Sequence, residues 1–526
     1  MRQQIVFAVA ELTAVATILG LSTSILLAQT ATSSAQPPPL TRRLSLEDVV
    51  RLALDQNLGI KVERYNPQIQ DLSVAQARGL WTPILSSTFQ GNRSNTPSTN
   101  IFAGGLTSII DSGVTTGVGV SQALKTGANY ALGWSGARTT STNPFNSYNP
   151  LISSGVTFSI TQPLLRNFKI DTIRQQLETS MKDRDASDLD LLAAITQTTR
   201  DVKNAYWDLT YQIDNLNAFR QSLDLAKELL SDNEKRVQAG TMASLDIVEA
   251  QSEVARNEEL VIVADSAMRQ AEDHLRVLIF DPNAPDFWTV SIEPSDIAAF
   301  QVQQVDLDAA VRRALDARTD LRLIKNSIAR NDVNIRYFEN QAMPEVDARA
   351  VYSGNAVGGS ALAPLTSFPI VGPIQRQIQT ESGFPSVLGT AFAGGYPTWT
   401  LGVTVGYPIG KSPSEASLAR ARLQSSQAAT QLKNQELQVV AQVRDVARQV
   451  ETNAKRVDTT RAARELAERR LDVEQRKFGA GIQTSFFVFQ AQRDLSQARV
   501  AEARATADYN KSLADFEAVQ QAPLTR

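Results

Sequence analysis

The sequence predicts an α+β protein built from two similar halves, each combining a few β-strands with very long antiparallel helices. Three observations support this prediction. One pattern of segments occurs twice along the 526 residues. Short stretches in each half alternate apolar with small or polar residues. Two helical stretches of roughly 65–70 residues lack Pro and Gly, and at ~1.5 Å of rise per residue each would be about 100 Å long.

The internal repeat is clearest where each half begins. Segment 46–55 resembles segment 307–316, which starts 261 residues later, and Pro83 and Pro344 keep the same spacing. Proline lacks an N–H and disfavours helix in the residue before it, so each proline is expected to end a helix and open a strand region. Two further pairs of segments follow in the same order, 156–161 with 401–406 and 236–251 with 477–492.

These matches divide the chain into segments. A secretory signal peptide is expected at 1–35, because Arg2 precedes an apolar run and a small-residue cleavage pattern ends at Ala35. A membrane anchor helix is the alternative for this segment. The remaining expected boundaries are a Pro-rich linker at 36–43, a first repeat at 44–280 with strands at about 84–162 and a helical hairpin tip near 240, a linker at 281–304, a second repeat at 305–520 with strands at about 345–407 and a tip near 481, and a tail at 521–526.

Alternation of apolar and polar residues predicts about four strands. It is strongest at 398–407 and 156–161, present at 130–134 and weaker at 114–122, and the region after Pro344 offers a partner for the first of these. The alternation fits a soluble sandwich and an outer-membrane barrel equally well. Four strands cannot close a barrel, and open edges are not tolerated in lipid. A membrane role would therefore require several chains to share one barrel.

Apolar residues in the long helices repeat every seven residues, which predicts a coiled-coil seam. The seam residues are Val202, Leu209, Leu216, Leu223, Leu230 and Val237 in the first half and Val443, Val450, Val457, Leu471 and Phe478 in the second. A filamentous coiled coil is the alternative, but it needs neither strand clusters nor a repeated half.

The composition argues against several classes of function. A net charge of −3 gives no basic field for nucleic acid. The absence of cysteine excludes thiolate catalysis and Cys-ligated zinc, and the single histidine, His274, has no second histidine for a metal site. No glycine-rich phosphate loop precedes a helix. We therefore expect no enzyme activity, no cofactor and no metal.

The two turns between the long helices resemble the tips of the TolC-like outer-membrane efflux family, which carry Gly, then Ser or Thr, an acidic residue and Ala-Gln. The corresponding segments are 236–251 and 476–492, and the resemblance extends over about 44–519. It includes Thr126-Gly127 and the Gln-Pro-Leu-Leu that begins at Gln162. The resemblance implies a homotrimer in which each chain gives about four strands to a twelve-stranded β-barrel, continuous with an α-barrel of long helices.

A protein of this family would be the outer-membrane exit duct of a tripartite efflux or type I secretion system. It would passively conduct substrates from an inner-membrane pump across the periplasm and the outer membrane. The implied partners are two further copies of the chain, a periplasmic adaptor (membrane fusion) protein, the pump through that adaptor, and outer-membrane lipid. The alternative is a periplasmic coiled-coil structural or adhesion protein without a membrane barrel.

The tips also supply candidate gate residues. Asp246 occupies the acidic position of the first tip, with Glu249 close behind it. The second tip departs from the family pattern. The two positions that are acidic in the family correspond to Phe487 and Gln490, and the family's usual Tyr and Arg correspond to Phe478 and Gln483. We therefore expect the closed entrance to be held by apolar packing near 486–489 rather than by an acidic ring. Packing of the helix pair alone is the alternative role of these phenylalanines.

Adaptor contacts are expected at the same turns. Glycine allows backbone turns that other residues resist, and Ser244 is expected to cap the helix that follows it. The residues expected to contact an adaptor are Arg236, Gly240 and Ser244 in the first tip and Arg476, Gly481 and Ser485 in the second.

Overall fold

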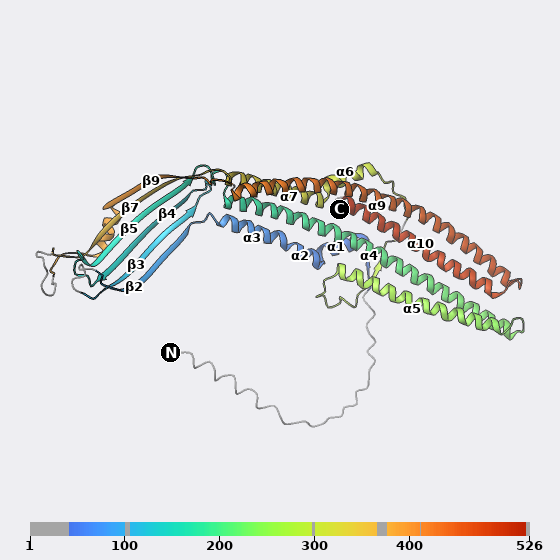
Figure 1. Cartoon of the computed structure of the whole chain (residues 1–526). Helices are drawn as coiled ribbons and strands as arrows, with labels where there is room; N and C mark the ends of the chain where they lie inside the picture. The colour runs from blue at the N-terminus through green and yellow to red at the C-terminus, as the bar shows by residue number, and fades with distance from the viewer. Residues whose placement is uncertain (1–40, 100–105, 297–299, 365–375, 411, 522–526) are drawn as a thin grey trace, which may run out of the picture.

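The structure is a computed structural model that describes residues 41–99, 106–296, 300–364, 376–410 and 412–521. The expected signal peptide, most of the Pro-rich linker and nearly all of the C-terminal tail lie outside these residues. Figure 1 shows an elongated molecule with a β-sheet at one end and long helices along the rest. No helix among the described residues is both long and apolar enough to cross a membrane.

Two helical hairpins dominate the molecule. Helices α4 (Thr172–Gln238) and α9 (Pro413–Gly479) have 67 residues each, and their partners α5 (Leu245–Ile279) and α10 (Ser485–Gln520) have 35 and 36. Both long helices begin at a side-chain cap. Asp171 accepts a hydrogen bond from the N–H of Arg174, and Ser412 accepts one from Ser414. The repeat predicted for the helices is therefore present.

Shorter helices open each half, and they match at the predicted spacing. In the first half these are α1 (Leu46–Gln56), α2 (Leu58–Glu63) and α3 (Tyr65–Gly79). In the second half they are α6 (Leu307–Ala317) and α7 (Thr319–Gln341). The junction residues Asn57 and Arg318 have almost the same backbone angles, φ −58° and ψ 125° against φ −59° and ψ 129°.

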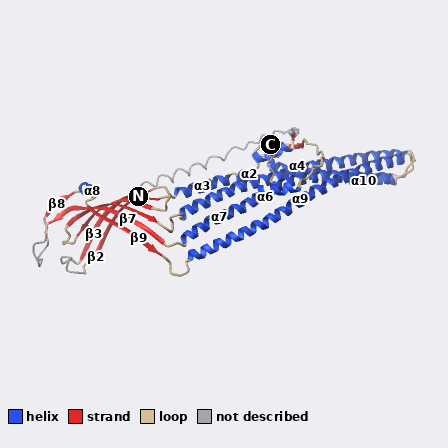
Figure 2. Cartoon of the chain, turned by 90° about the horizontal axis from the view of Figure 1, so that it is seen from above, coloured by secondary structure: helices blue, strands red, loops and turns tan. Residues whose placement is uncertain are grey.

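Most of the predicted heptad seam lies in the core of the helical part, but Leu223, Leu230 and Val237 toward the first tip are only partly buried. Val202 and Leu209 on α4 have no exposed surface, and their equivalents Val443 and Val450 on α9 are 0% and 2% exposed. Next to the sheet, α4 packs between α3 and α7, and α7 packs against α9 (Figure 2). Toward the tips α10 packs between α4 and α9. The chain therefore builds a layer of side-by-side helices.

The segment joining the two halves is held by two buried tyrosines. Strand β6 (Ser291–Pro294) pairs in parallel with β1 (Thr41–Leu44). The hydroxyl of Tyr206 on α4 contacts the Asp296 carboxylate at 3.1 Å, and burial raises the pKa of this tyrosine to about 12. The hydroxyl of Tyr509 on α10 donates to the Gln301 carbonyl at 2.8 Å. Each half thus fixes one part of the linker.

The sheet is larger than predicted. Six long antiparallel strands lie side by side in the described residues: β2 (Ile84–Pro97), β3 (Ser108–Ala123), β4 (Asn129–Ser141), β5 (Tyr148–Pro163), β7 (Glu345–Leu362) and β9 (Tyr396–Gly406). A short strand, β8 (Ile378–Ser382), pairs with β7 beyond the end of β9. The expectation of about four strands is wrong because β2 and the outer parts of β3, β4 and β7 are rich in Ser, Gly, Asn and Thr. Those residues are typical of loops.

The two faces of the sheet differ in chemistry across all six long strands. The pairing registers place Leu85, Val120, Leu132, Phe158, Tyr352 and Trp399 in one row, hence on one face. The adjacent row on the opposite face is small and polar: Ser86, Gly119, Gly133, Thr157, Ser353 and Thr398. The sheet is therefore amphipathic from edge to edge.

A short helix, α8 (Phe384–Phe392), lies between β8 and β9 in the chain and covers part of the apolar face over β5 and β7. It packs on glycines of β7: a Cβ at Gly354 would come within 2.6 Å of the Ala391 carbonyl oxygen, and one at Gly358 within 2.5 Å of Val387. The ring of Phe384 meets Trp134 edge-on at 6.0 Å. Small strand residues thus allow the helix to lie directly on the sheet.

Candidate functional site

The two turns at the far ends of the hairpins have the same geometry. Gly240 and Gly481 adopt φ values of +76° and +73°, which favour glycine. After α4, the N–H groups of Gly240 and Thr241 donate to the carbonyls of Val237 and Arg236. The second tip repeats this pattern, and both helices therefore end in a Schellman motif. The prediction that the glycines form the turns is confirmed.

The cap predicted for α5 is wrong. Ser244 has helical backbone angles, φ −62° and ψ −23°, and its side chain makes no capping hydrogen bond. A capping residue needs an extended backbone so that its side chain can reach the free N–H groups. Here the backbone N–H groups of Asp246 and Ile247 donate instead to the carbonyls of Ala243 and Ser244.

An apolar cluster joins the two hairpins near their tips. Phe478 is 6% exposed and Phe489 4% exposed, and both pack in a cluster that includes Leu229 and Ala250 of the first hairpin. Arg236 of α4 lies over the Phe478 ring, 4.4 Å from its centroid, and donates to the Phe478 carbonyl at 3.2 Å. Phe478 therefore binds one hairpin to the other, and Arg236 completes this contact.

Polar contacts continue the connection along α10. Arg499 donates to Gln221 of α4 at 2.6 Å, and Arg493 lies 3.9 Å from Glu253 of α5. Further from the tips, Lys511 pairs with Asp208 at 2.8 Å. Sequence reasoning missed all of these residues, because charged residues on a long helix usually mark a solvated face.

Several buried polar atoms in this interface have no partner among the described protein atoms. They are Asn233 Oδ1, Ser485 Oγ and Ser496 Oγ. An unpaired buried polar atom costs about 1–3 kcal/mol. The contact between the hairpins is therefore less favourable than a fully satisfied core would be.

The predicted gate residues do not form one cluster within a chain. Phe478 lies in the core, whereas Phe487 is 41% exposed and meets the half-exposed Phe486 edge-on at 5.5 Å. Asp246, Gln483 and Gln490 are partly exposed, and Glu249 is exposed. Of the six predicted contact residues, Gly240, Ser244, Arg476 and Gly481 are exposed, Arg236 is partly covered, and Ser485 has no exposed surface.

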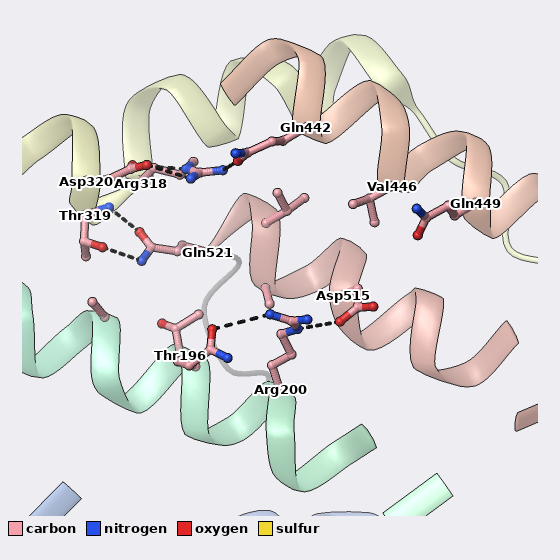
Figure 3. Close-up of a pocket in the computed structure, with 14 residues that line it drawn as sticks. Thr196, Arg200, Arg318, Thr319, Asp320, Gln442, Val446, Gln449, Asp515 and Gln521 are labelled. Atoms are coloured by element: carbon pink, nitrogen blue, oxygen red, sulfur yellow. Dashed lines mark hydrogen bonds and ion pairs between the residues drawn. The ribbon is translucent and has the colours of Figure 1, made fainter. Parts of the chain in front are cut away.

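A polar cavity of about 460 Å³ lies further from the tips, between α4, α7, α9 and α10 (Figure 3). Its charged side chains are engaged with one another: Arg318 pairs with Asp320 at 2.6 Å, and Arg200 pairs with Asp515. Burial opposes ionisation of Asp320, but hydrogen bonds from Arg318 and Gln435 outweigh it and lower its pKa. Arg318 also donates to Gln442 of α9 at 2.9 Å, and the N–H of Thr319 donates to Gln521, which follows α10, at 2.6 Å. The side chains around the cavity therefore tie the start of α7 to α9 and to the end of α10. Among the described residues no cluster of His, Asp or Glu could hold a metal ion.

An amphipathic sheet that continues directly into two long helical hairpins is the architecture of a channel protein that spans the outer membrane and reaches into the periplasm. Residues 49–279 and 310–519 match the model of the outer membrane efflux protein family, and the chain belongs to this family. Apart from the number of strands, the predicted fold class is confirmed, as are the function in efflux, the outer-membrane location and the absence of an enzymatic role. A comparison with curated protein sequences gave no match.

Solved structures with the same fold come from several bacteria. The MtrE outer membrane channel of Neisseria gonorrhoeae, in its open state, is 16% identical, with a TM-score of 0.63 over 92% of this chain and 90% of that one. The CmeC outer membrane channel of Campylobacter jejuni is 14% identical, with a TM-score of 0.62 over 90% and 85%. A membrane protein from Pseudomonas aeruginosa is 15% identical, with a TM-score of 0.63 over 90% and 93%.

Proposed function

We propose that three copies of the chain form one continuous duct, which conducts substrates passively from an inner-membrane pump to the exterior. The observation that carries this proposal is the amphipathic sheet of six long strands, whose long edges β2 and β9 pair with no further strand among the residues that the structure describes. Lipid tolerates neither edge, because unpaired N–H and C=O groups have no water to bind there. Further copies of the chain would pair these edges, and the helices below them would then form a ring.

Adaptor contacts belong at the tips in this proposal. Large apolar side chains are exposed there, with Leu245 66% exposed, Val248 59% and Ile482 77%. They lie beside the exposed residues Gly240, Ser244, Arg476 and Gly481. A periplasmic adaptor covering both tips would bury this apolar surface and connect the duct to the pump. Ser485 is buried and leaves the proposed surface, and Arg236 is already in contact with Phe478.

The proposed gate rests on the difference between two buried and two exposed phenylalanines near the second tip. Phe478 and Phe489 hold the hairpins together, which leaves Phe486 and Phe487 exposed at the start of α10. Three copies of this pair would narrow the entrance with apolar rings, and an apolar constriction closes by excluding water. Asp246 and Glu249 lie on α5 of the first hairpin, and this proposal gives them no part in the apolar constriction.

The first experiment measures the detergent-extracted protein of an outer-membrane fraction by light scattering coupled to sedimentation. A strongly elongated particle near three times the mass of one mature chain supports the duct. A monomer or dimer that needs no detergent overturns it and favours a periplasmic coiled-coil scaffold.

Two further measurements test the tips. The chain has no cysteine, so Ser244→Cys carries a single thiol. A cysteine-reactive crosslinker should join it to a co-expressed adaptor protein, whereas the buried control Ser485→Cys should remain unlinked.

For the gate, Phe487→Ala should raise the ion leak of the closed channel in planar bilayers. A strong divalent-cation block of the closed state that Phe487→Ala leaves unchanged would contradict the apolar gate.

A further inference from the structure

The strands differ in how they connect to the helices. Helix α3 leads into β2, and β5 leads into α4, while α7 leads into β7 and β9 leads into α9. Strands β3 and β4 form a hairpin that connects to no helix at either end. Their shared turn, 124–128, points back toward the helices (Figure 1). The first half therefore holds one strand pair more than its two helix connections require.

This β3–β4 hairpin is a full member of the sheet. Val120 and Leu132 continue the apolar row, and Gly119 and Gly133 continue the polar row. Its turn is seated at the junction between sheet and helices: a Cβ at Gly127 would come within 2.4 Å of the Asn167 carbonyl oxygen. Arg174 donates to that same carbonyl at 2.7 Å. The β3–β4 hairpin is therefore an integral part of the sheet, and its turn packs against the start of the helices.

The two free edges of the sheet are complementary. Six antiparallel strands are an even number, so β2 and β9 run in opposite directions. The edge β9 of one chain can thus add to β2 of the next chain in the same antiparallel pattern, with apolar residues on a common face. Trp399 and Leu401 on β9 and Leu85 and Phe89 on β2 supply that face.

We propose that the β3–β4 hairpin widens the exit of this duct, because three chains of six strands close a barrel of about eighteen strands rather than twelve. This inference rests on the proposed trimer. At a strand spacing of ~4.8 Å and a tilt of ~40°, eighteen strands give a backbone diameter of about 36 Å, and twelve give about 24 Å. Twelve helices spaced ~9–10 Å apart form a ring of about the larger diameter.

The wider exit has a consequence for the cargo. The polar face of the sheet is lined mostly by Ser, Thr and Gly, which leave the bore open. A barrel of this width holds an aqueous channel. The entrance at the tips, rather than the membrane exit, therefore sets the largest solute that passes.

Engineered disulfides test the closure in the full-length chain, which has no native cysteine. Leu401→Cys is combined in turn with Leu85→Cys, Ser87→Cys or Phe89→Cys and exposed to a mild oxidant. At least one pair should give a disulfide-linked trimer. The matched control combines Leu401→Cys with Val118→Cys on the interior strand β3, and should give none. Linkage of the control pair alone overturns the proposed closure.

A deletion tests the width. Residues 98–147 are replaced by Gly-Ser-Gly, which joins β2 to β5 and keeps Leu85 and Phe158 on one face. End-on electron-microscopy averages of the detergent-extracted trimer should show a barrel whose diameter falls to about two-thirds of that of the full chain. A full-length trimer about 24 Å wide overturns the wider exit but leaves the proposed duct intact. A full-length chain that forms no trimer overturns the duct itself.

Discussion

The two halves of the chain agree in their helices and differ in their strands. The long helices have 67 residues in both halves, and their partners have 35 and 36. The first half contributes four long strands, β2 to β5, whereas the second contributes β7 and β9 with the short β8 and α8 between them. Both hairpins have to end at the same level to share one tip cluster. A strand pair can be added to the sheet without moving any helix.

The largest expected effect concerns the extra strand pair. Gly127→Val places a branched side chain at φ +83° and against the Asn167 carbonyl, at a cost of about 3 kcal/mol or more. The 124–128 turn should then leave its seat, and Lys125 should become cleavable by trypsin. Mass spectrometry of a limited digest measures this cleavage. Gly402→Val on β9, where a Cβ meets nothing within 4 Å, is the control and should stay intact.

The second effect compares equivalent seam positions of the two long helices. Leu209→Ala removes a fully buried side chain from α4 and should cost about 2–5 kcal/mol. Val450→Ala removes less from the equivalent place on α9, about 1.6 kcal/mol at ~0.8 kcal/mol per methylene. In thermal unfolding in detergent, the melting temperature of Leu209→Ala should therefore be lower than that of Val450→Ala, and both should be lower than that of the parent chain. Equal melting temperatures for parent and Leu209→Ala would contradict the shared seam.

The third effect concerns the tyrosines that hold the linker. The Tyr206 hydroxyl bonds to the carboxylate and the N–H of Asp296, and the Tyr509 hydroxyl bonds to the Gln301 carbonyl and the Gln303 N–H. Tyr206→Phe and Tyr509→Phe each remove these two linker contacts and should each cost about 1–2 kcal/mol. Because burial raises the pKa of Tyr206 to about 12, its contribution is present below pH 10 and is lost as the pH rises through 12. The free energy of unfolding should therefore fall less steeply between pH 10 and pH 12 in Tyr206→Phe than in the parent chain. An identical pH profile would exclude this tyrosine as its source.

The smallest effect lies at the tips. Arg236 crosses to Phe478 of the other hairpin, while its equivalent Lys477 pairs with Glu474 on its own helix. Arg236→Lys should weaken the contact between the hairpins by about 0.5–1 kcal/mol and raise the open probability in bilayer recordings. Lys477→Arg is the matched control and should change nothing. If both variants have the same open probability, the contact between Arg236 and Phe478 does not keep the entrance closed.

The sequence predicts the repeat, the seam and the tips, because these depend on local signals. The 261-residue repeat spacing and the heptads can be read directly from the sequence, and Gly240 and Gly481 mark turns because glycine readily adopts the backbone angles found there. Pro83 predicts that a strand region opens there, but alternation does not identify β2 as a strand, and the sequence does not show the contacts that join the two hairpins. The β2 segment holds few apolar residues, because one of its faces is polar and Leu85 and Phe89 are the large apolar residues on the other. Arg499 and Gln221 are 278 residues apart and look like solvated charges until the helices pack.

The equal helix lengths restrict how the reach of this protein can change. One residue inserted in α4 alone would advance its tip by ~1.5 Å and rotate everything beyond the insertion by ~100°, which turns the buried seam toward solvent. Only whole heptads preserve the seam, and each adds about 10 Å. The same step has to occur in α4, α5, α9 and α10 together for both turns to stay level. The depth of periplasm that such a protein crosses is therefore quantised, and it changes only by simultaneous insertion at four places in one gene.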